Sequence, residues 1–154
     1  MPENTRFETR RLSADDVDLF RQLLATFGRA FDDTETYEGA QPRKTYLEGL
    51  LGSDQFIALA ALAGDRVVGG LAAYELKKFE QERTELYIYD LAVDESYRRR
   101  GLAIRLIEHL KKTAVNRGIY VIFVQADLGD DAAISLYTKL GIREDVLHFD
   151  IAPS

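Results

Sequence analysis

The segment SYRRRGLAIRLIEHLKK contains the residues of this chain that are best suited to binding an anion. Arg98, Arg99 and Arg100 directly precede Gly101, and an amphipathic helical pattern begins at Leu102. The free amides and the dipole of a helix N-terminus attract anions, and neighbouring guanidinium groups add charge-assisted hydrogen bonds. A pyrophosphate suits this arrangement, and a solvated turn is the alternative. Because neither G-x-x-x-x-G-K-[ST] nor G-x-G-x-x-G occurs, the sequence predicts another kind of phosphate cradle.

The acidic residues of the chain point to a second task. The formal net charge of -6 argues against a general nucleic-acid binder, because such proteins carry a basic face. Carboxylates that converged on one cleft would bind and steer a polycation, whereas any single one of them is better explained by a solvated rim. The candidates are Asp32, Asp33, Glu35, Glu80, Glu144, Asp145 and Asp150.

Several other kinds of chemistry are disfavoured by composition. The chain has no cysteine, which removes disulfides, thiolate zinc sites and cysteine nucleophiles. His109 and His148 lack metal-ligand spacing, so we expect no metal, and no serine lies in a nucleophile-elbow context. The N-terminal MPENTRFETR does not resemble a signal peptide, and no apolar run approaches the ~20 residues of a membrane span. We therefore expect a soluble, cytoplasmic protein without a membrane partner.

The pattern from Leu12 to Phe27 predicts a first helix. Ser13 can cap it, Asp16 can reach back to Ser13, and Gly28 is expected to end it. A loop and a second helix at 44–51 should follow. The length and composition predict one domain over residues 1–154.

The rest of the chain alternates strands and helices. Two apolar runs around the Gly64-Asp65 turn predict a hairpin. The later expected elements are a strand at 84–93, a helix from 102 to 118, a strand at 120–126, a helix at 130–140 and a last strand at 146–151. A strand, a crossover helix and another strand fed by a hairpin indicate a mixed α/β sheet.

Two motifs carry a resemblance to a known family. Residues 98–103, RRRGLA, fit [R/Q]-x-x-G-x-[G/A], and residues 133–142, AISLYTKLGI, resemble A-x-x-x-Y-x-K-x-G-[F/I]. Both resemble motifs of the GNAT superfamily of acyl-CoA-dependent N-acetyltransferases. The segments FIALAAL, LAAYELKKFEQ, YIYDLAV, VQADLGDDAA and LYTKLGIRED-VLHFDI are similar to the type I aminoglycoside 3-N-acetyltransferases. The resemblance implies a GNAT fold, with a mixed, mostly antiparallel sheet splayed at its middle and flanked by helices.

The resemblance also implies acetyl-CoA as the acetyl donor. The main chain near Leu91 and Val93 would contact the pantetheine arm, and Tyr137 would protonate the departing thiolate. A core tyrosine is the alternative for Tyr137. The implied cofactor-binding residues are Leu91, Ala92, Val93, Arg98, Arg99, Arg100, Gly101, Leu102, Ala103, Ala133 and Tyr137. Family members often have asparagine where this chain has Asp130, which cannot donate a hydrogen bond when ionised; either that contact is lost or Asp130 faces the acceptor.

The acceptor amine must be neutral when it attacks, so a carboxylate is expected to take its proton. Asp127, at the end of the 120–126 strand, is the first candidate and the predicted catalytic partner of Tyr137. Asp90 is the second, but strand alternation would place it on the face opposite Tyr87 and Tyr89, where the family usually has its catalytic carboxylates. The predicted substrate-binding residues are Asp127, Asp130, Tyr89, Glu80, Glu144, Asp145 and Asp150.

The resulting hypothesis is an acetyl-CoA-dependent aminoglycoside 3-N-acetyltransferase that acts on gentamicin-type antibiotics, confers resistance and forms no acyl-enzyme. Aminoglycosides are polycations, which suits the acidic residues. Two alternatives remain open: acetylation of another amine (a polyamine, an amino-acid derivative or a protein), and a non-catalytic acyl-CoA-binding module. The aromatic residues Phe79, Tyr120 and Phe149 are compatible with a homodimer.

Overall fold

The computed structural model describes residues 6–154 and contains two compact units, 1–123 and 124–154. The prediction of one domain over 1–154 stays a prediction, and the expectation that there is no signal peptide concerns in part residues 1–5, which lie outside the described residues. Across 6–154, no helix is both long and apolar enough to cross a membrane.

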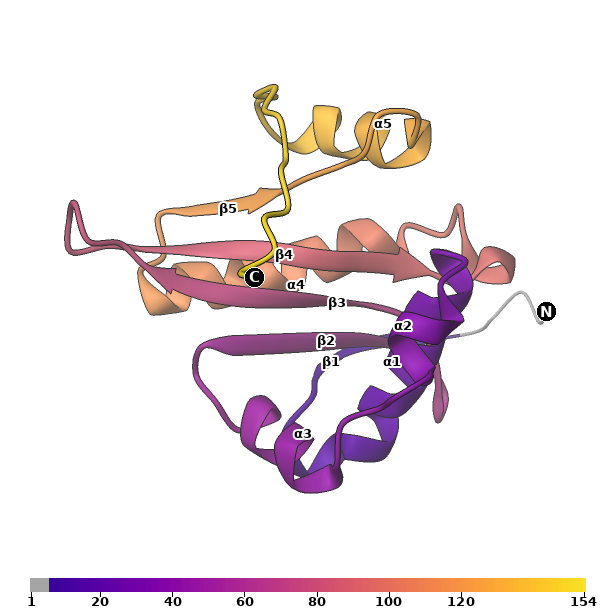
Figure 1. The fold of residues 1–154 in the computed structure, drawn as a ribbon. Helices are drawn as coiled ribbons and strands as arrows, with labels where there is room; N and C mark the ends of the chain where they lie inside the picture. Colours follow the sequence, from indigo (N-terminus) through magenta and orange to yellow (C-terminus); the bar gives the residue numbers. More distant parts are fainter. Residues whose placement is uncertain (1–5) are drawn as a thin grey trace. The chain divides into compact units, whose positions relative to one another are not determined.

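The centre of the first unit is a five-stranded sheet with the order β1-β2-β3-β4-β5. Its strands are β1 (Phe7–Arg11), β2 (Phe56–Ala63), β3 (Arg66–Lys77), β4 (Thr84–Val93) and β5 (Val121–Val124). The pairs β1/β2, β2/β3 and β3/β4 are antiparallel, and β5 runs in the direction of β4 (Figure 1). This confirms the expected hairpin and the expected mixed, mostly antiparallel sheet.

The predicted capping box is present one turn before helix α1 (Val17–Ala30). A 3-10 turn, Ala14–Asp16, precedes it; the Ser13 hydroxyl accepts from the Asp15 amide, and the Asp16 carboxylate accepts from the Ser13 amide at 2.8 Å. The prediction that Gly28 ends the helix is wrong. Gly28 instead permits close packing of the next short helix, α2 (Thr34–Glu38), because an added Cβ would lie 3.3 Å from Thr34 Cα.

The two faces of the sheet are covered by different helices. The even-numbered residues of β2, from Phe56 to Leu62, join a buried core with α1 and α3 (Lys44–Leu51). Alternation turns Ile57, Leu59 and Ala61 to the other face, where α4 (Leu102–Arg117) packs with its buried leucines. Figure 1 shows α1, α2 and α3 in front of the sheet and α4 behind it.

Two sequence-based expectations need correction. β1 was not expected, because FETRR is short and polar; it is an edge strand that pairs only with β2. The expected last strand at 146–151 is wrong, since residues 142–154 form neither helix nor strand. Within 124–154 the regular structure beyond β5 is α5 (Asp131–Leu140), and no strand among the described residues pairs with 142–154.

Candidate active site

The N-terminus of α4 has the features of an anion site. Gly101 is the N-cap residue in a left-handed conformation (φ +73°), and an added Cβ would meet no atom within 4 Å. The cap therefore brings no side chain that could bond to the first-turn amides of a 16-residue helix. Arg99 also has a positive φ, of 64°. This open helix end beside the arginines suits the diphosphate of coenzyme A.

The other two arginines of the motif have contacts of their own. The Arg98 Nε donates to the Val93 carbonyl at 3.1 Å, and the Arg100 guanidinium lies 6.0 Å from the centre of the Tyr97 ring. Arg98 therefore braces the chain between the end of β4 and the start of α4, in addition to any role toward an anion.

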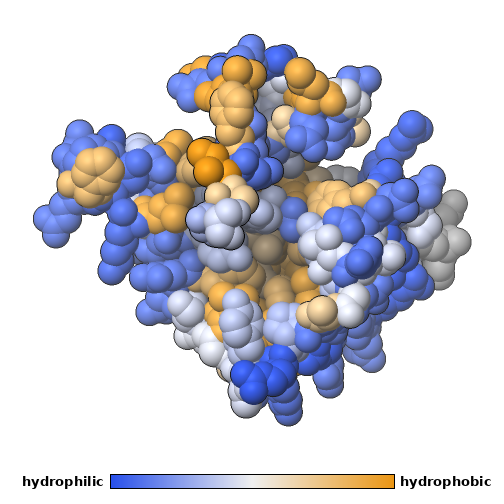
Figure 2. Space-filling view, viewed as in Figure 1, coloured by the Kyte–Doolittle hydropathy of each residue, from blue (hydrophilic) through white to orange (hydrophobic). Residues whose placement is uncertain are grey.

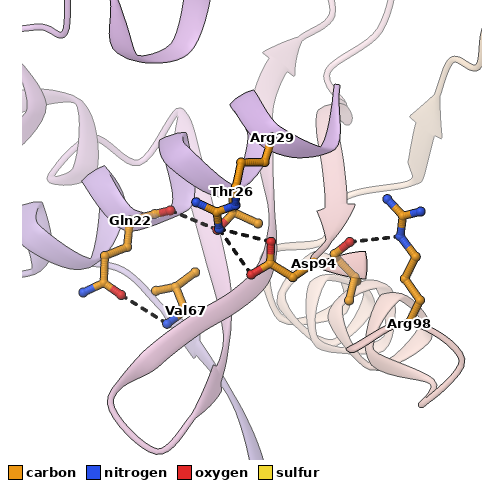
Figure 3. A network of polar contacts seen from close by, with 7 residues as sticks. Gln22, Thr26, Arg29, Val67, Asp94 and Arg98 are labelled. Atoms are coloured by element: carbon orange, nitrogen blue, oxygen red, sulfur yellow. Dashed lines mark hydrogen bonds and ion pairs between the residues drawn. The ribbon is translucent and has the colours of Figure 1, made fainter. Parts of the chain in front are cut away.

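Asp94, the residue directly after β4, fixes this loop to α1. It is buried, and its carboxylate accepts from Arg29 Nη2 at 3.1 and 3.2 Å (Figure 3). Its amide donates to the Val68 carbonyl. A groove of about 630 Å³ borders the pair and is lined by Arg29, Ala30, Arg66, Asp94, Glu95, Ser96 and Arg98. The start of the loop is thus held by an ion pair between α1 and β4.

A β-bulge in β4 changes the expected place of Asp90. Ala72 pairs with Asp90 and the next residue, Ala73, pairs with Ile88, so Tyr89 is the extra residue. Because two residues oppose one at a bulge, the alternation restarts there. Asp90 therefore lies opposite Ala72 on the face covered by α1, and the prediction that it faces away from Tyr87 and Tyr89 is wrong.

The surroundings of Asp90 suit a proton acceptor. Its Oδ2 accepts a hydrogen bond of 2.7 Å from the Tyr37 hydroxyl of α2. Burial raises the pKa of Asp90, and the Tyr37 hydrogen bond opposes part of that rise. The same burial, the hydrogen bond and the Asp90 charge raise the pKa of Tyr37. Tyr37 thus stays a neutral donor toward a carboxylate that holds a proton more readily than an exposed aspartate.

Tyrosines from α2, β3 and β4 lie near this carboxylate, and α3 adds a tyrosine beside Tyr74. Tyr74 lies opposite Tyr87, and Tyr89 contacts both rings, with centroids 5.9 and 5.7 Å away. Burial first and neighbouring tyrosines next raise the pKa of Tyr74, one of these neighbours being Tyr46 of α3. We call Tyr37, Tyr46, Tyr74, Tyr87 and Tyr89 the tyrosine cluster. Figure 2 looks onto this face and shows residues of intermediate hydropathy over the middle strands.

Sequence reasoning found one member of this cluster as a site residue, Tyr89. Tyr74 and Tyr87 could have been found by counting outward from the turn between β3 and β4, because these strands pair tyrosine with tyrosine. Tyr37 had no such signal, since it lies in the segment that was interpreted as a loop. Phe123 of β5 stacks on Tyr87 at 4.6 Å and extends the aromatic surface.

In the second unit, α5 carries Tyr137 and is capped by Asp130. The Asp130 carboxylate accepts from the Ala133 amide at 3.2 Å, which gives this residue a structural task that neither earlier interpretation included. Burial, followed by the Asp130 charge, raises the pKa of Tyr137 to about 12. A tyrosine with this pKa is protonated at neutral pH and has a proton to donate.

Most of the remaining predicted acidic residues form ion pairs or hydrogen bonds with residues close in the sequence. Glu80 pairs with Lys78 and Arg83 at the β3-β4 turn, at 3.6 and 3.7 Å. Arg143 pairs with Asp145 at 2.7 Å, and His148 with Asp150 at 2.8 Å. The Asp127 carbonyl accepts from the Asp130 amide. Substrate roles for these residues, and for Glu144, stay predictions.

Comparison with known proteins agrees with this geometry. Residues 18–142 match the model of the acetyltransferase (GNAT) family. The chain is 60% identical to the aminoglycoside acetyltransferase HMB0005 from an uncultured soil metagenomic sample, over 97% of this chain and 99% of that one, with a TM-score of 0.95. It is 31% identical to meta-AAC0020, an aminoglycoside acetyltransferase of similar origin solved with sisomicin, over 96% and 97% of the chains, with a TM-score of 0.89.

A curated relative has a different acceptor. The chain is 29% identical over 101 residues to the [ribosomal protein bS18]-alanine N-acetyltransferase of Salmonella typhimurium, and the match covers 66% of this chain and 64% of that protein. The family model spans most of the chain and includes α4 and α5 with their motifs. The chain belongs to the GNAT family of acetyltransferases, whose acetyl donor is acetyl-CoA.

Proposed function

We propose that this acetyltransferase acetylates an amine of an aminoglycoside. The observation that carries the proposal is the 60% identity to HMB0005 over nearly the whole of both chains. The finer assignment, acetylation at the 3-amine of the 2-deoxystreptamine ring of gentamicin-type drugs with resistance as the result, is supported by the resemblance of its segments to the type I 3-N-acetyltransferases.

The tyrosine cluster supports an acceptor of this class. Tyr46 and Tyr89 are each 61% exposed, so their rings are free to stack against apolar faces of sugar rings. Aromatic faces also attract ammonium groups, by about 0.5–1 kcal/mol at exposed sites. A rigid amino sugar offers both an apolar ring face and several cations.

The proposed reaction needs one base and one acid from the protein. Acetyl-CoA, when bound, supplies the acetyl group as a thioester. Asp90 takes a proton from the acceptor nitrogen, directly or through a water, as the new C–N bond forms. Tyr137 gives its proton to the sulfur as the C–S bond breaks, so the products are the N-acetyl amine and the free thiol. The α4 N-terminus, with Arg99 and Gly101, holds the diphosphate.

Asp127 keeps a place in the proposal as a carboxylate that binds an acceptor ammonium. Its role differs from that of Asp90 because binding a cation affects KM, whereas accepting the proton affects kcat. The other predicted acceptor residues are Asp130, Tyr89, Glu80, Glu144, Asp145 and Asp150. Contact of the main chain from Leu91 to Val93 with the pantetheine arm, and of Leu102, Ala103 and Ala133 with acetyl-CoA, also belongs to the proposal.

The test is thiol release from acetyl-CoA with gentamicin, kanamycin, spermidine and a peptide with an N-terminal alanine. We expect turnover with gentamicin and loss of most of it in Tyr137→Phe, with NMR of the product locating the acetyl group. The peptide tests the second candidate, which the ribosomal-protein relative favours. Turnover with the peptide or spermidine alone would reject the aminoglycoside assignment.

A homodimer is part of the proposal as well. Its support is the exposed Phe79 at the β3-β4 turn, with a side chain that is 97% exposed. Light scattering on the purified protein and on Phe79→Ser distinguishes a dimer that uses this turn from a monomer.

A further inference from the structure

The hydrogen bond between Tyr37 and Asp90 joins residues that are far apart in the sequence. Tyr37 belongs to α2, Asp90 to β4, and the oxygen atoms are 2.7 Å apart. The other carboxylate oxygen, Oδ1, takes no part in this hydrogen bond. The Tyr37 hydroxyl therefore holds the carboxylate through one of its two oxygens.

The Tyr37 ring is held in place by aromatic packing. Its centroid lies 5.8 Å from that of Phe27 and 5.9 Å from that of Phe31, and these two phenylalanines stack on each other. An added Cβ on Gly28 would lie 3.4 Å from the Tyr37 Cβ, so the backbones of α1 and α2 are in close contact there. The hydroxyl is thus presented to Asp90 by a preformed support.

The groups that face Asp90 come from three elements. Tyr37 lies on α2, Tyr74 on β3, and Tyr87 and Tyr89 on β4 itself. Asp33, the N-cap of α2, is a further charged group that acts on Tyr37. No cation is among these groups, so the hydrogen bond from Tyr37 is the protein's contact that favours the ionised carboxylate.

We propose that Tyr37 is a positioning residue for Asp90: its hydroxyl fixes the carboxylate through Oδ2 and directs Oδ1 at the acceptor nitrogen. The inference rests on the proposed function for the identity of the base. Removal of the hydroxyl should have two effects. The carboxylate loses its orientation, which lowers kcat, and it loses a donor that stabilises its charged form, which raises its pKa.

The test uses Tyr37→Phe, which keeps the ring and its packing. We expect kcat with the amine to fall about 10-fold, less than the roughly 10²-fold or more for loss of a general base because Asp90 itself remains, while KM for acetyl-CoA stays unchanged. The acidic limb of the kcat/KM profile should move up by about one pH unit, since a charge-assisted hydrogen bond is removed. The amine's own titration is common to both enzymes and cancels in the comparison.

Tyr120→Phe is the matched control. The Tyr120 hydroxyl also donates to a carboxylate, that of Glu85, at 2.5 Å, but at the other end of β4. The control variant should leave the acidic limb and kcat where they are.

A direct titration separates this inference from the proposed function. Carbon-13 NMR of aspartate carboxyl groups, with the Asp90 signal assigned through Asp90→Asn, needs no substrate. A higher Asp90 pKa in Tyr37→Phe than in the wild type supports the inference, even if no aminoglycoside is acetylated. An unchanged Asp90 pKa together with an unchanged acidic limb overturns it. If Tyr37→Phe does not fold, Gly28→Ala, which pushes α2 from α1, should raise the same pKa by a smaller amount.

Discussion

Two aspartates near the end of β4 show how one segment can hold two carboxylates with different roles. Asp94 is buried and receives the Arg29 guanidinium of α1. Asp90, four residues earlier, receives the neutral Tyr37 hydroxyl of α2. The first partner is a cation that compensates the charge, whereas the second is a neutral donor that binds one of the two carboxylate oxygens.

The difference shows why the partner, and not the residue type, decides the task. An aspartate paired with arginine serves to connect elements, here α1 with the loop that leads into α4. An aspartate beside tyrosines in a half-buried place has a raised pKa and can both take and release a proton. Four predictions test this contrast.

The largest expected effect is that of Asp90→Asn on the rate. Asparagine has the same shape and still accepts from Tyr37, but it cannot take a proton from the amine. We expect kcat/KM for the acceptor to fall by about 10²- to 10⁴-fold, as for loss of a general base, with KM for acetyl-CoA unchanged. Asp127→Asn should raise KM for the acceptor instead. If Asp127→Asn caused the larger fall in kcat, the base would be Asp127.

The next effect is on stability, in Arg29→Ala. Removing the guanidinium leaves the buried Asp94 carboxylate without its charged partner, which should lower the free energy of unfolding by about 2 kcal/mol. Urea denaturation measures the change. Asp94→Asn in the same background should restore part of it, because the buried charge is then gone; two purely additive losses would contradict the coupling.

A smaller effect should follow from Gly28→Ala, which should disturb the contact of Tyr37 with Asp90 and leave the Arg29–Asp94 pair in place. The added Cβ would press on Thr34 and Tyr37 at 3.3 and 3.4 Å, so α2 must shift. We expect kcat with the amine to fall by about 3- to 5-fold. This is a smaller fall than the one expected when the Tyr37 hydrogen bond is removed altogether. KM for acetyl-CoA should stay the same, since Arg29 and Asp94 are not displaced. Steady-state kinetics with each substrate varied in turn tests this split.

The smallest effect is a pH dependence of stability. Burial raises the pKa of Asp90 in the folded protein above its unfolded value, so the folded state binds this proton more tightly. The resulting stabilisation is present below the unfolded pKa and is lost as the pH rises through the folded pKa. At neutral pH, Asp90→Asn should therefore raise Tm by on the order of 1 °C, because solvent screens a half-exposed group. The advantage of the variant should disappear in acid; an equal difference at both pH values would contradict the assignment.

Local patterns were sufficient for most elements of the first unit. The capping residues Ser13 and Asp16, the hairpin turn at Gly64 and the start of α4 at Leu102 are each fixed by contacts within a few residues. The same holds for the anion site, because a helix N-terminus after Gly101 is a local feature. β1 could not be found in this way, since a short polar edge strand depends on its neighbour for its identity.

By itself, the sequence therefore determined the family, the candidate anion site at the start of α4 and the acid candidate Tyr137, all of which rest on short motifs. Only the tertiary structure made Asp90 the first candidate for the base. The bulge at Tyr89 reverses the face of Asp90, and α2 brings Tyr37 to it from 53 positions away. Side-chain alternation can be counted along a regular strand, but a bulge exists only between two paired strands, so no count along one of them can predict it.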